Sequence, residues 1–233
     1  HLGDICKLVI EEKADFGIVV DPDVDRLAFI SNDGEMFGEE YTLVACADYV
    51  LSKTPGNTVS NMSSSRALRD ITNKHSGNYQ ASAVGEVNVV ELMKKTNAII
   101  GGEGNGGIIY PESHYGRDSL VGVALFLTHL ASLDMTVAEL RASYPQYYMS
   151  KNKIELTPQI DVDALLEAMT ENYKHEDITT IDGVQIDFAE NWVHLRKSNT
   201  EPIIRIYTEA QTQQLAEDLA NRIIGEIKEV AGI

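Results

Sequence analysis

The amino-acid sequence predicts an α/β protein: a layered domain with a mixed, mainly parallel sheet, followed by a smaller α+β domain with an antiparallel sheet flanked by helices. In the first part, short apolar segments alternate with helical patterns of about 10–15 residues, the order typical of parallel sheets. In the second part apolar segments follow one another more closely, and the dipeptide Asp182-Gly183 is a strong hairpin signal. We expect the boundary near residues 143–150.

Helices in the first part are predicted from apolar residues at helical spacing and from acidic or serine residues at their starts. Glu39 and Glu40 open one of these helices, and the serines at 63–65 are expected to cap another. The expected helices are 2–14, 39–52, 64–75, 87–96 and 119–132. The expected strands, which are short apolar or β-branched runs between them, are 16–20, 27–30, 58–61, 79–84, 98–101 and 108–110.

The second part shows more strand than helix. Its expected strands are 154–156, 178–181, 184–188, 192–196 and 203–209. Its expected helices are 161–172 and 212–230. Strands in this order, joined by short connections, favour an antiparallel sheet with the two helices packed against it.

Composition excludes several classes of partner. The chain has 233 residues with 36 acidic against 19 basic side chains, a net charge of −17. Because binding along nucleic acid needs an excess of cations, we expect no nucleic acid partner, and the same charge disfavours an anionic membrane. No apolar run approaches the roughly 18–20 residues that span a bilayer. Cys6 and Cys46 lie in helical patterns, which argues against a disulfide framework and favours a cytoplasmic location.

An acidic loop follows the predicted strand 16–20 and places Asp21, Asp23 and Asp25 at alternate positions. In extended backbone, alternate residues share one face, so we expect the three carboxylates to point the same way. A hard divalent cation with oxygen ligands relieves their repulsion, and Mg²⁺ is the usual choice beside phosphate. Arg26 adds a cation that can bind phosphate oxygens in a forked geometry. The loop therefore predicts a metal site that serves a phosphorylated substrate.

Three other kinds of acidic loop can be compared with this one. A solvated acidic turn remains open. An EF-hand is excluded, because that loop needs Gly at its sixth and Glu at its twelfth position, where this chain has Arg26 and Asn32. A phosphatase with Asp21 as nucleophile and Asp23 as acid also remains open, although that class usually has Thr or Val where Asp25 stands.

A glycine-rich loop, residues 101–107, follows the predicted strand 98–101 and contains five glycines. Glycine lets backbone approach a ligand closely, and the loop's side chains, Glu103 and Asn105, can bind sugar hydroxyl or amino groups. A dinucleotide fingerprint fits poorly, because no helical pattern follows the loop directly. A flexible turn without a ligand is the alternative interpretation.

A basic turn lies between two predicted strands of the second part, with the sequence R-K-S-N-T-E-P at 196–202, and Arg205 follows it. Arg196, Lys197 and Arg205 together with hydroxyl and backbone N–H groups form a candidate phosphate-binding site. A solvated basic turn is the alternative. In residues 85–88, Glu86 is either a ligand contact or a helix-starting charge, and the second interpretation is favoured. Residues 114–118 either cover the pocket or form a loop and helix cap, and the helix cap is favoured.

The three loops, in this order, resemble those of the α-D-phosphohexomutase superfamily, which includes phosphoglucomutase, phosphomannomutase and phosphoglucosamine mutase. The family's metal loop reads D-G-D-G-D-R, and residues 21–26 match its three aspartates and its arginine. Its sugar loop reads G-E-x-S-G-H, matched at 102–107 by Gly, Glu and the inner Gly. Its phosphate loop, R-x-S-[GN]-T-E-P, is matched in full at 196–202.

The resemblance implies roles for these residues. Asp21, Asp23 and Asp25 hold Mg²⁺, and Arg26 is catalytic. The substrate-binding residues are Glu103, Asn105 and Gly107, and the phosphate-binding residues are Arg196, Ser198, Asn199, Thr200 and Arg205. The implied reaction moves phosphate between O6 and O1 of a hexose phosphate (glucosamine, glucose or mannose phosphate) through a phosphoserine and a bisphosphate intermediate. The implied domains are 1–38, the end of family domain 2, then 39–145, domain 3, and 146–233, domain 4.

The chain also departs from the family pattern. Pro22 and Val24 replace two glycines and should stiffen the metal loop, while Asn105 and Gly107 replace Ser and His. This version of the sugar loop looks like phosphoglucosamine mutases of the archaeal and Bacteroidetes type. The family often has a cationic residue shortly before the position of Gly85, which is missing here, so a proton-transfer role at that place is in doubt.

Nothing in the sequence matches the family's T-A-S-H-N-P phosphoserine segment. The chain begins at His1 in a helical pattern, so we expect a C-terminal fragment of a longer protein that does not turn over by itself. A non-catalytic module that binds sugar phosphate remains an alternative.

Overall fold

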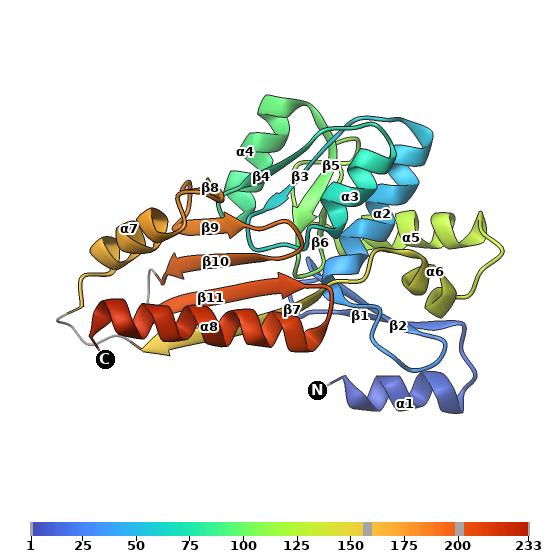
Figure 1. Cartoon of the computed structure of the whole chain (residues 1–233). Coiled ribbons are helices and arrows are strands. Elements are labelled where there is room, and N and C mark those ends of the chain that lie inside the picture. Colours follow the sequence, from blue (N-terminus) through green and yellow to red (C-terminus); the bar gives the residue numbers. More distant parts are fainter. Residues whose placement is uncertain (1, 156–159, 199–202, 233) are drawn as a thin grey trace. The chain divides into compact units, whose positions relative to one another are not determined.

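The computed structural model describes residues 2–155, 160–198 and 203–232 (Figure 1). The chain forms two compact units, His1–Pro145 and Gln146–Ile233. Each unit has its own sheet and its own helices.

The first unit is built on a four-stranded sheet in the order β4-β3-β5-β6. The strands are β3 (Asn57–Asn61), β4 (Tyr79–Ser82), β5 (Ala98–Glu103) and β6 (Gly107–Ile109). β3 pairs in parallel with β4 and with β5, whereas β6 returns antiparallel to β5. The prediction of a mixed, mainly parallel sheet is confirmed.

Helices cover both faces of this sheet: α4 (Glu86–Thr96) lies on one face, and α2 (Glu39–Lys53) and α3 (Ala67–Lys74) lie on the other (Figure 1). Val89 and Met93 of α4 are buried against Val59 of β3 and Ala98 of β5. α5 (Ser119–Ala131) packs beside α2. A short helix that was not expected, α6 (Val137–Ser143), begins with a capping box.

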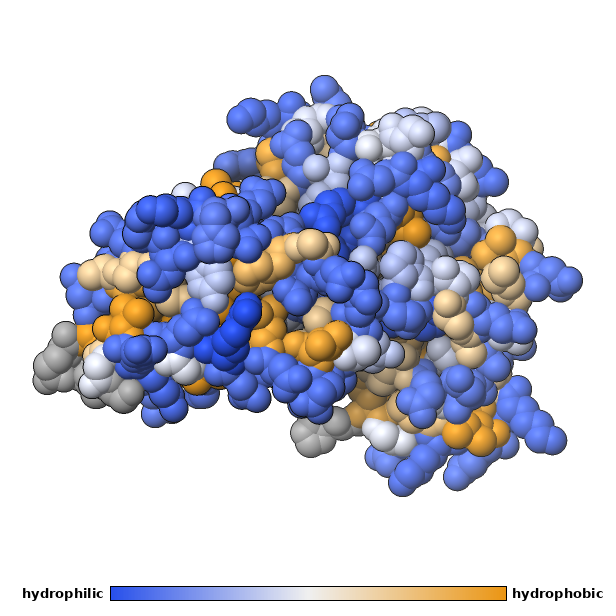
Figure 2. Space-filling view, in the orientation of Figure 1, coloured by the Kyte–Doolittle hydropathy of each residue, from blue (hydrophilic) through white to orange (hydrophobic). Residues whose placement is uncertain are grey.

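The N-terminal segment forms α1 (Gly3–Glu11) and an antiparallel hairpin of β1 (Phe16–Val20) and β2 (Leu27–Ser31). Aromatic rings attach this hairpin to the rest of the unit, since Phe29 of β2 stacks on Phe126 of α5 with ring centroids 3.9 Å apart. The tip of the hairpin is the acidic loop, so this packing fixes the loop beside the sheet. Leu8 and Ile10 of α1 are more than half exposed, and Figure 2 shows hydrophobic surface over α1.

The second unit contains a five-stranded antiparallel sheet in the order β7-β11-β10-β9-β8. The strands are β7 (Tyr148–Glu155), β8 (Asp177–Thr179), β9 (Val184–Asp187), β10 (Trp192–Lys197) and β11 (Ile203–Ala210). Two helices, α7 (Val162–Asn172) and α8 (Gln213–Ala231), bury one face of the sheet in a single hydrophobic core. The predicted antiparallel sheet flanked by helices is confirmed.

Two local expectations for the second unit were wrong in detail. β7 begins at Tyr148, well before the predicted start at 154, because its whole length pairs with β11. The hairpin at Asp182-Gly183 forms, but its loop is longer than two residues, since Thr179 already pairs with Gln185. Gly183 adopts φ +73°, the conformation that made the dipeptide a turn signal.

Candidate metal and sugar-phosphate site

The three aspartates of the acidic loop converge. Ligand oxygens of Asp21, Asp23 and Asp25 all lie within 4.8 Å of one another. The predicted route to this cluster was wrong, because the loop is a tight turn and not extended backbone. The N–H of Val24 donates to the carbonyl of Asp21 at 3.0 Å, and Val24 adopts φ +58°, which is unfavourable for a β-branched residue. Turn geometry, and not strand alternation, gathers the carboxylates.

Asp21 organises this turn. Its Oδ1 accepts the backbone N–H groups of Asp25 and Arg26, both at 3.2 Å, and its Oδ2 accepts from Arg26 Nε at 2.7 Å. Desolvation would raise the pKa of Asp21, but these hydrogen bonds outweigh it and lower the pKa below its usual value. The same pair raises the pKa of Arg26, so both groups are charged at neutral pH. The predicted catalytic arginine is therefore anchored to a predicted metal ligand.

Asp25 retains capacity for a cation. Its Oδ2 is ion-paired with Nη2 of Arg117 at 2.5 Å, whereas its buried Oδ1 has Arg26 Nε at 3.7 Å but accepts no hydrogen bond in the part of the chain that the structure describes. Asp23 is exposed and can also turn toward a ligand. A buried carboxylate oxygen without a partner is costly unless a cation occupies its lone pairs. This donor set of carboxylate oxygens fits Mg²⁺, which prefers oxygen ligands.

Glu103 of the glycine-rich loop is buried at the end of β5, with 5% of its surface exposed. Its Oε1 accepts from Nδ2 of Asn61 at 2.9 Å, and its Oε2 accepts from Nη1 of Arg117 at 3.0 Å. Asn61 is itself fixed, because its Oδ1 accepts from the hydroxyl of Ser64 at 3.1 Å. Sequence reasoning did not anticipate Asn61, whose place at the end of the neighbouring parallel strand was the available signal.

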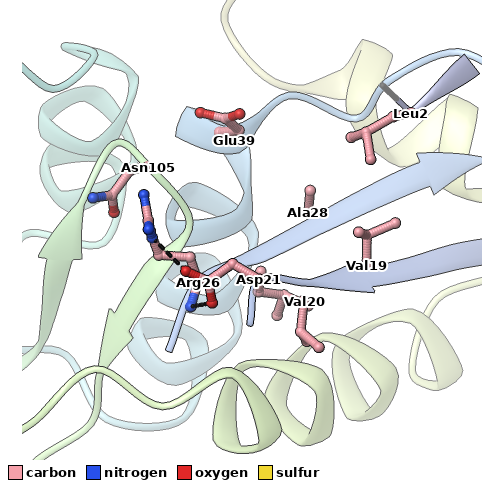
Figure 3. Close-up of a pocket in the computed structure, with 9 residues that line it drawn as sticks. Leu2, Val19, Val20, Asp21, Arg26, Ala28, Glu39 and Asn105 are labelled. Carbon is pink, nitrogen blue, oxygen red and sulfur yellow. Dashed lines mark hydrogen bonds and ion pairs between the residues drawn. The ribbon is translucent and has the colours of Figure 1, made fainter. Parts of the chain in front are cut away.

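Asn105 lies at the tip of the same loop, where its Oδ1 accepts the N–H of Gly107 at 3.1 Å. Its side chain borders a pocket of about 310 Å³ that is also lined by Asp21, Arg26 and Glu39 (Figure 3). The predicted sugar loop and the predicted metal loop therefore meet at one pocket. Their contact is also direct, because the N–H of Leu27 donates to the carbonyl of Gly106 at 3.1 Å.

Close backbone approach explains two glycines of this loop. A Cβ at Gly104 would come within 2.0 Å of the Glu40 carboxylate, which also accepts the N–H of Ser65 at 2.8 Å. A Cβ at Gly106, where φ is +83°, would come within 2.0 Å of the Leu27 carbonyl. The glycines permit contact with α2 and with β2, so the loop is a packed element and not a flexible turn.

Arg117 is a site residue in the segment 114–118, for which the sequence favoured a helix cap over a role at the pocket. It lies just before α5, and its guanidinium contacts the carboxylates of Asp25, Glu103 and Glu86. The backbone N–H of Arg117 also donates to Glu86 Oε1 at 3.0 Å. The next residue, Asp118, caps α5 as expected. The sequence signals were the position of this segment before an apolar helix and an arginine in a strongly acidic chain.

The serines at 63–65 were expected to cap α3, but the N-cap residue is Arg66. Ser65 Oγ does accept the N–H of Ala67 at 3.1 Å. The hydroxyl of Ser64 instead accepts the N–H of Gly104 at 2.9 Å and so supports the sugar loop. The end of β3 therefore carries polar groups that serve the site as well as the helix.

The basic turn of the second unit brings two predicted residues together. Arg196 of β10 and Arg205 of β11 are directly opposite each other, so both side chains lie on the same face of the sheet. Arg196 has an ion pair with Asp182 at 4.0 Å. Lys197 points to the other face and pairs with Asp163 of α7 at 3.4 Å, so its inclusion in one basic cluster was wrong.

Part of the predicted phosphate loop lies outside the described residues, namely Asn199 and Thr200 with the two residues that follow them. Ser198 is described, and its N–H donates to the carbonyl of Ile203 at 3.0 Å. β10 and β11, which precede and follow the loop, are therefore paired up to its two ends.

Comparison with known proteins yields a consistent family. The family model for the phosphoglucomutase/phosphomannomutase alpha/beta/alpha domain III matches residues 38–148, and the model for the C-terminal domain of the same family matches residues 152–226. The chain therefore belongs to the phosphoglucomutase/phosphomannomutase family, within the α-D-phosphohexomutase superfamily.

Curated relatives agree with this assignment. The chain is 32% identical to the phosphoglucosamine/phosphogalactosamine mutase of Sulfurisphaera tokodaii, across 98% of the chain and 50% of that protein. It is 34% identical to the phosphoglucomutase/phosphomannomutase of Thermococcus kodakarensis, across 94% of the chain and 48% of that protein. The chain spans about half the length of the curated relatives it matches.

Solved structures share the fold. A phosphoglucomutase/phosphomannomutase family protein of Burkholderia thailandensis matches with a TM-score of 0.85 and 22% identity, over 99% of this chain and 50% of that one. Aspergillus fumigatus N-acetylphosphoglucosamine mutase, solved in complex with GlcNAc-6P and magnesium, matches with a TM-score of 0.65 and 14% identity, over 92% and 48%. Within the described residues, no helix combines the length and the apolar character needed to cross a membrane.

Proposed function

We propose that this chain provides the metal, sugar and phosphate loops of a phosphohexomutase, which moves phosphate between O6 and O1 of a hexose phosphate through a phosphoserine and a bisphosphate. Residues 1–38 contribute the metal loop, 39–145 the sugar loop and 146–233 the phosphate loop. The substrate is a glucosamine, glucose or mannose phosphate, and the names of the relatives support this range. The two cysteines are free, which agrees with a cytoplasmic location.

One observation carries the proposal: three carboxylates converge beside the pocket that Asn105 of the sugar loop also borders. Oδ1 of Asp25 is buried without a hydrogen-bond partner among the described residues, which makes it a ready ligand. When bound there, Mg²⁺ neutralises charge on a transferring phosphoryl group. Arg26, held by Asp21, is positioned to bind an oxygen of that group.

The other residues bind the substrate without reacting. Glu103 and Asn105 hold sugar hydroxyl or amino groups, and the fixed Glu103 carboxylate has lone pairs left beyond its two hydrogen bonds. Arg196 and Arg205, with Ser198, Asn199 and Thr200, bind the phosphate that does not react. Two guanidinium groups on one sheet face suit a dianion, because each can form a charge-assisted, forked contact.

Amide NMR spectra of the chain during titration with glucosamine 6-phosphate, with and without Mg²⁺, test this assignment. We expect shifts in residues 21–26 on addition of Mg²⁺, and in residues 102–107 and 196–205 on addition of the sugar phosphate. Asp23→Asn should abolish the first set and leave the shifts at 196–205 in place. Shifts that avoid all three loops would contradict the proposal.

An aspartyl phosphatase is the second candidate for the acidic loop, with Asp21 as nucleophile. Against it, the Asp21 carboxylate already accepts three hydrogen bonds within its own loop, which lowers its nucleophilicity. The variant Asp21→Asn separates the two functions. Loss of a trapped phosphoenzyme would support the phosphatase, whereas weaker Mg²⁺ binding with no phosphoenzyme in either protein supports the mutase.

A binding module without catalysis is the third candidate. The printed sequence has no segment like T-A-S-H-N-P, so we expect these 233 residues alone to bind sugar phosphate without interconverting its isomers. Incubation with glucose 1-phosphate or glucosamine 1-phosphate, followed by assay of the 6-phosphate, checks this. Product formation by the pure chain would contradict the assignment of the nucleophile to a phosphoserine in such a segment.

A further inference from the structure

Arg117 joins three loops that are distant in the sequence. Nη2 contacts Asp25 Oδ2 at 2.5 Å, Nη1 contacts Glu103 Oε2 at 3.0 Å, and Nε lies 3.3 Å from Glu86 Oε2. The side chain is 21% exposed, so these contacts form in a partly desolvated place where charge interactions are strong. One arginine therefore connects the metal loop, the sugar loop and the start of α4.

Glycine at position 107 makes room for this side chain. A Cβ on Gly107 would lie 2.4 Å from Cδ of Arg117 and 3.0 Å from its Cγ. The stem of Arg117 thus occupies the space that any larger residue at 107 would need. Gly107, one of the predicted substrate-binding residues, has no side chain, and the side chain of Arg117 packs in the space that this leaves.

The contact with Asp25 leaves a distinctive arrangement. Arg117 holds Oδ2, and the buried Oδ1 accepts no hydrogen bond in the described part of the chain, with Arg26 Nε at 3.7 Å as its ion-pair neighbour. A carboxylate fixed through one oxygen presents the other in a defined direction. Outer partners that orient metal ligands in this way typically contribute about 10–100-fold to metal affinity.

We propose that Arg117 is a positioning residue that aims Asp25 at the divalent cation and fixes Glu103 at the same time, so that the metal loop and the sugar loop are held by one side chain. The inference rests on the proposed metal site. The direction of the effect on metal affinity distinguishes two roles of Arg117. If its guanidinium acted only through its positive charge, it would weaken metal binding. If it orients Asp25, it strengthens metal binding.

The first experiment needs no metal. Amide hydrogen exchange in EDTA should accelerate in residues 21–26 and in residues 103–107 together in Arg117→Met, because both loops lose the same anchor. Arg141→Met is the matched control, since Arg141 belongs to the same unit and bonds the carbonyl of Phe37 at 2.8 Å. Exchange that changes in neither loop, in only one, or equally in both variants would overturn the proposal.

The second experiment measures Mn²⁺ affinity by electron paramagnetic resonance on folded protein. Arg117→Met should weaken Mn²⁺ binding about tenfold or more. Arg117→Lys keeps the charge but not the forked geometry, so its Mn²⁺ affinity should lie between those of Arg117→Met and the unchanged protein. Unchanged or tighter binding in Arg117→Met would overturn the proposal. Asp23→Asn distinguishes an error in the metal site from an error in the role of Arg117. If Asp23→Asn leaves Mn²⁺ binding unchanged, the proposed metal site is wrong, and the hydrogen-exchange experiment alone tests Arg117.

Discussion

Each unit brings side chains of like charge together. The charges are negative in the first unit and positive in the second, and different structural features place them. In the first unit, Asp21, Asp23 and Asp25 converge in a turn that Arg26 and Arg117 hold by ion pairs. In the second unit, two arginines face each other across adjacent strands, and the sheet register places them there. The acidic cluster is held by hydrogen bonds within its turn and by Arg117 from a distant segment, whereas the basic pair is placed by the hydrogen-bond ladder of a sheet.

This difference bears on how a strongly acidic chain could hold the cation and the anion that we propose as its ligands. Like charges directly opposite on a sheet are destabilising, and so are neighbouring carboxylates without a partner. Ion pairs within each unit offset part of this repulsion, from Arg26 and Arg117 in the first unit and from Asp182 in the second. The acidic cluster depends on loop contacts such as those of Arg117, and the basic pair depends on the pairing of β10 with β11.

The largest expected effects come from loop glycines. In Gly183→Ala the Cβ would meet the Leu195 carbonyl at 2.1 Å with φ +73°, and in Gly106→Ala it would meet the Leu27 carbonyl at 2.0 Å with φ +83°. We expect each to lower the free energy of unfolding by about 2–3 kcal/mol. Trp192, the single tryptophan, lies in the second unit, so its fluorescence should report early unfolding in Gly183→Ala only. Equal effects of both changes on Trp192 would show that the units do not unfold separately.

The basic pair can be tested with neighbours on one strand. Arg196→Met should weaken binding of glucosamine 6-phosphate about tenfold or more, because a charge-assisted contact is lost. Lys197→Met changes a side chain on the opposite face, paired with Asp163, and should leave the affinity unchanged. Calorimetric titration of both variants measures the difference. A larger loss in Lys197→Met would mean that register does not define the phosphate site.

Acid should affect the units at different pH. Burial lowers the pKa of His194 in the second unit, so the folded state keeps it neutral. Stability from this group is complete above the unfolded pKa of about 6.5 and falls as the pH drops below it. In the first unit burial would raise the pKa of Asp48, but hydrogen bonds from His129 and His75 lower it, so that contribution is lost only below about pH 4.

Urea unfolding between pH 7 and pH 4, followed by Trp192 fluorescence, measures the first of these losses. His194→Gln should flatten the pH dependence in that range, and Asp48→Asn should not alter it. Asp48→Asn should instead reduce the loss of stability of the first unit below pH 4. If the stability measured by Trp192 fluorescence depends on pH in the same way in His194→Gln, His194 is not the cause of the loss of stability between pH 7 and pH 4.

The smallest expected effect concerns the strained turn. Val24 adopts φ +58°, a conformation that costs an L-residue about 1–2 kcal/mol, while glycine costs about 0.5–1 kcal/mol of chain entropy. Val24→Gly should therefore stabilise the first unit by roughly 0–1.5 kcal/mol. Ser119 Oγ donates to the carbonyl of Val24 at 2.8 Å and should keep the turn in place in the variant. Thermal unfolding of the variant, compared with Val20→Ala as an exposed control, measures the change.

Sequence reasoning found the loops because each carries its chemistry in consecutive residues. The aspartates at 21, 23 and 25 are recognisable from their spacing, and Arg196 from its place at the start of a basic turn between two strands. Asn61 was missed, and Glu86 and Arg117 were given lesser roles, because their partners come from other loops that only the folded sheet brings together. The conformation of Val24 was also beyond the sequence, although its replacement of a family glycine pointed to an altered turn.

The central claim is that the acidic turn holds one divalent cation, and a crystal structure of the chain grown with Mn²⁺ tests it most directly. We predict an anomalous peak bound by carboxylate oxygens of Asp21, Asp23 and Asp25, with Asp25 contributing the oxygen that Arg117 does not hold. An ion found only elsewhere, or a saturating concentration of Mn²⁺ that leaves the turn without one, would contradict the account.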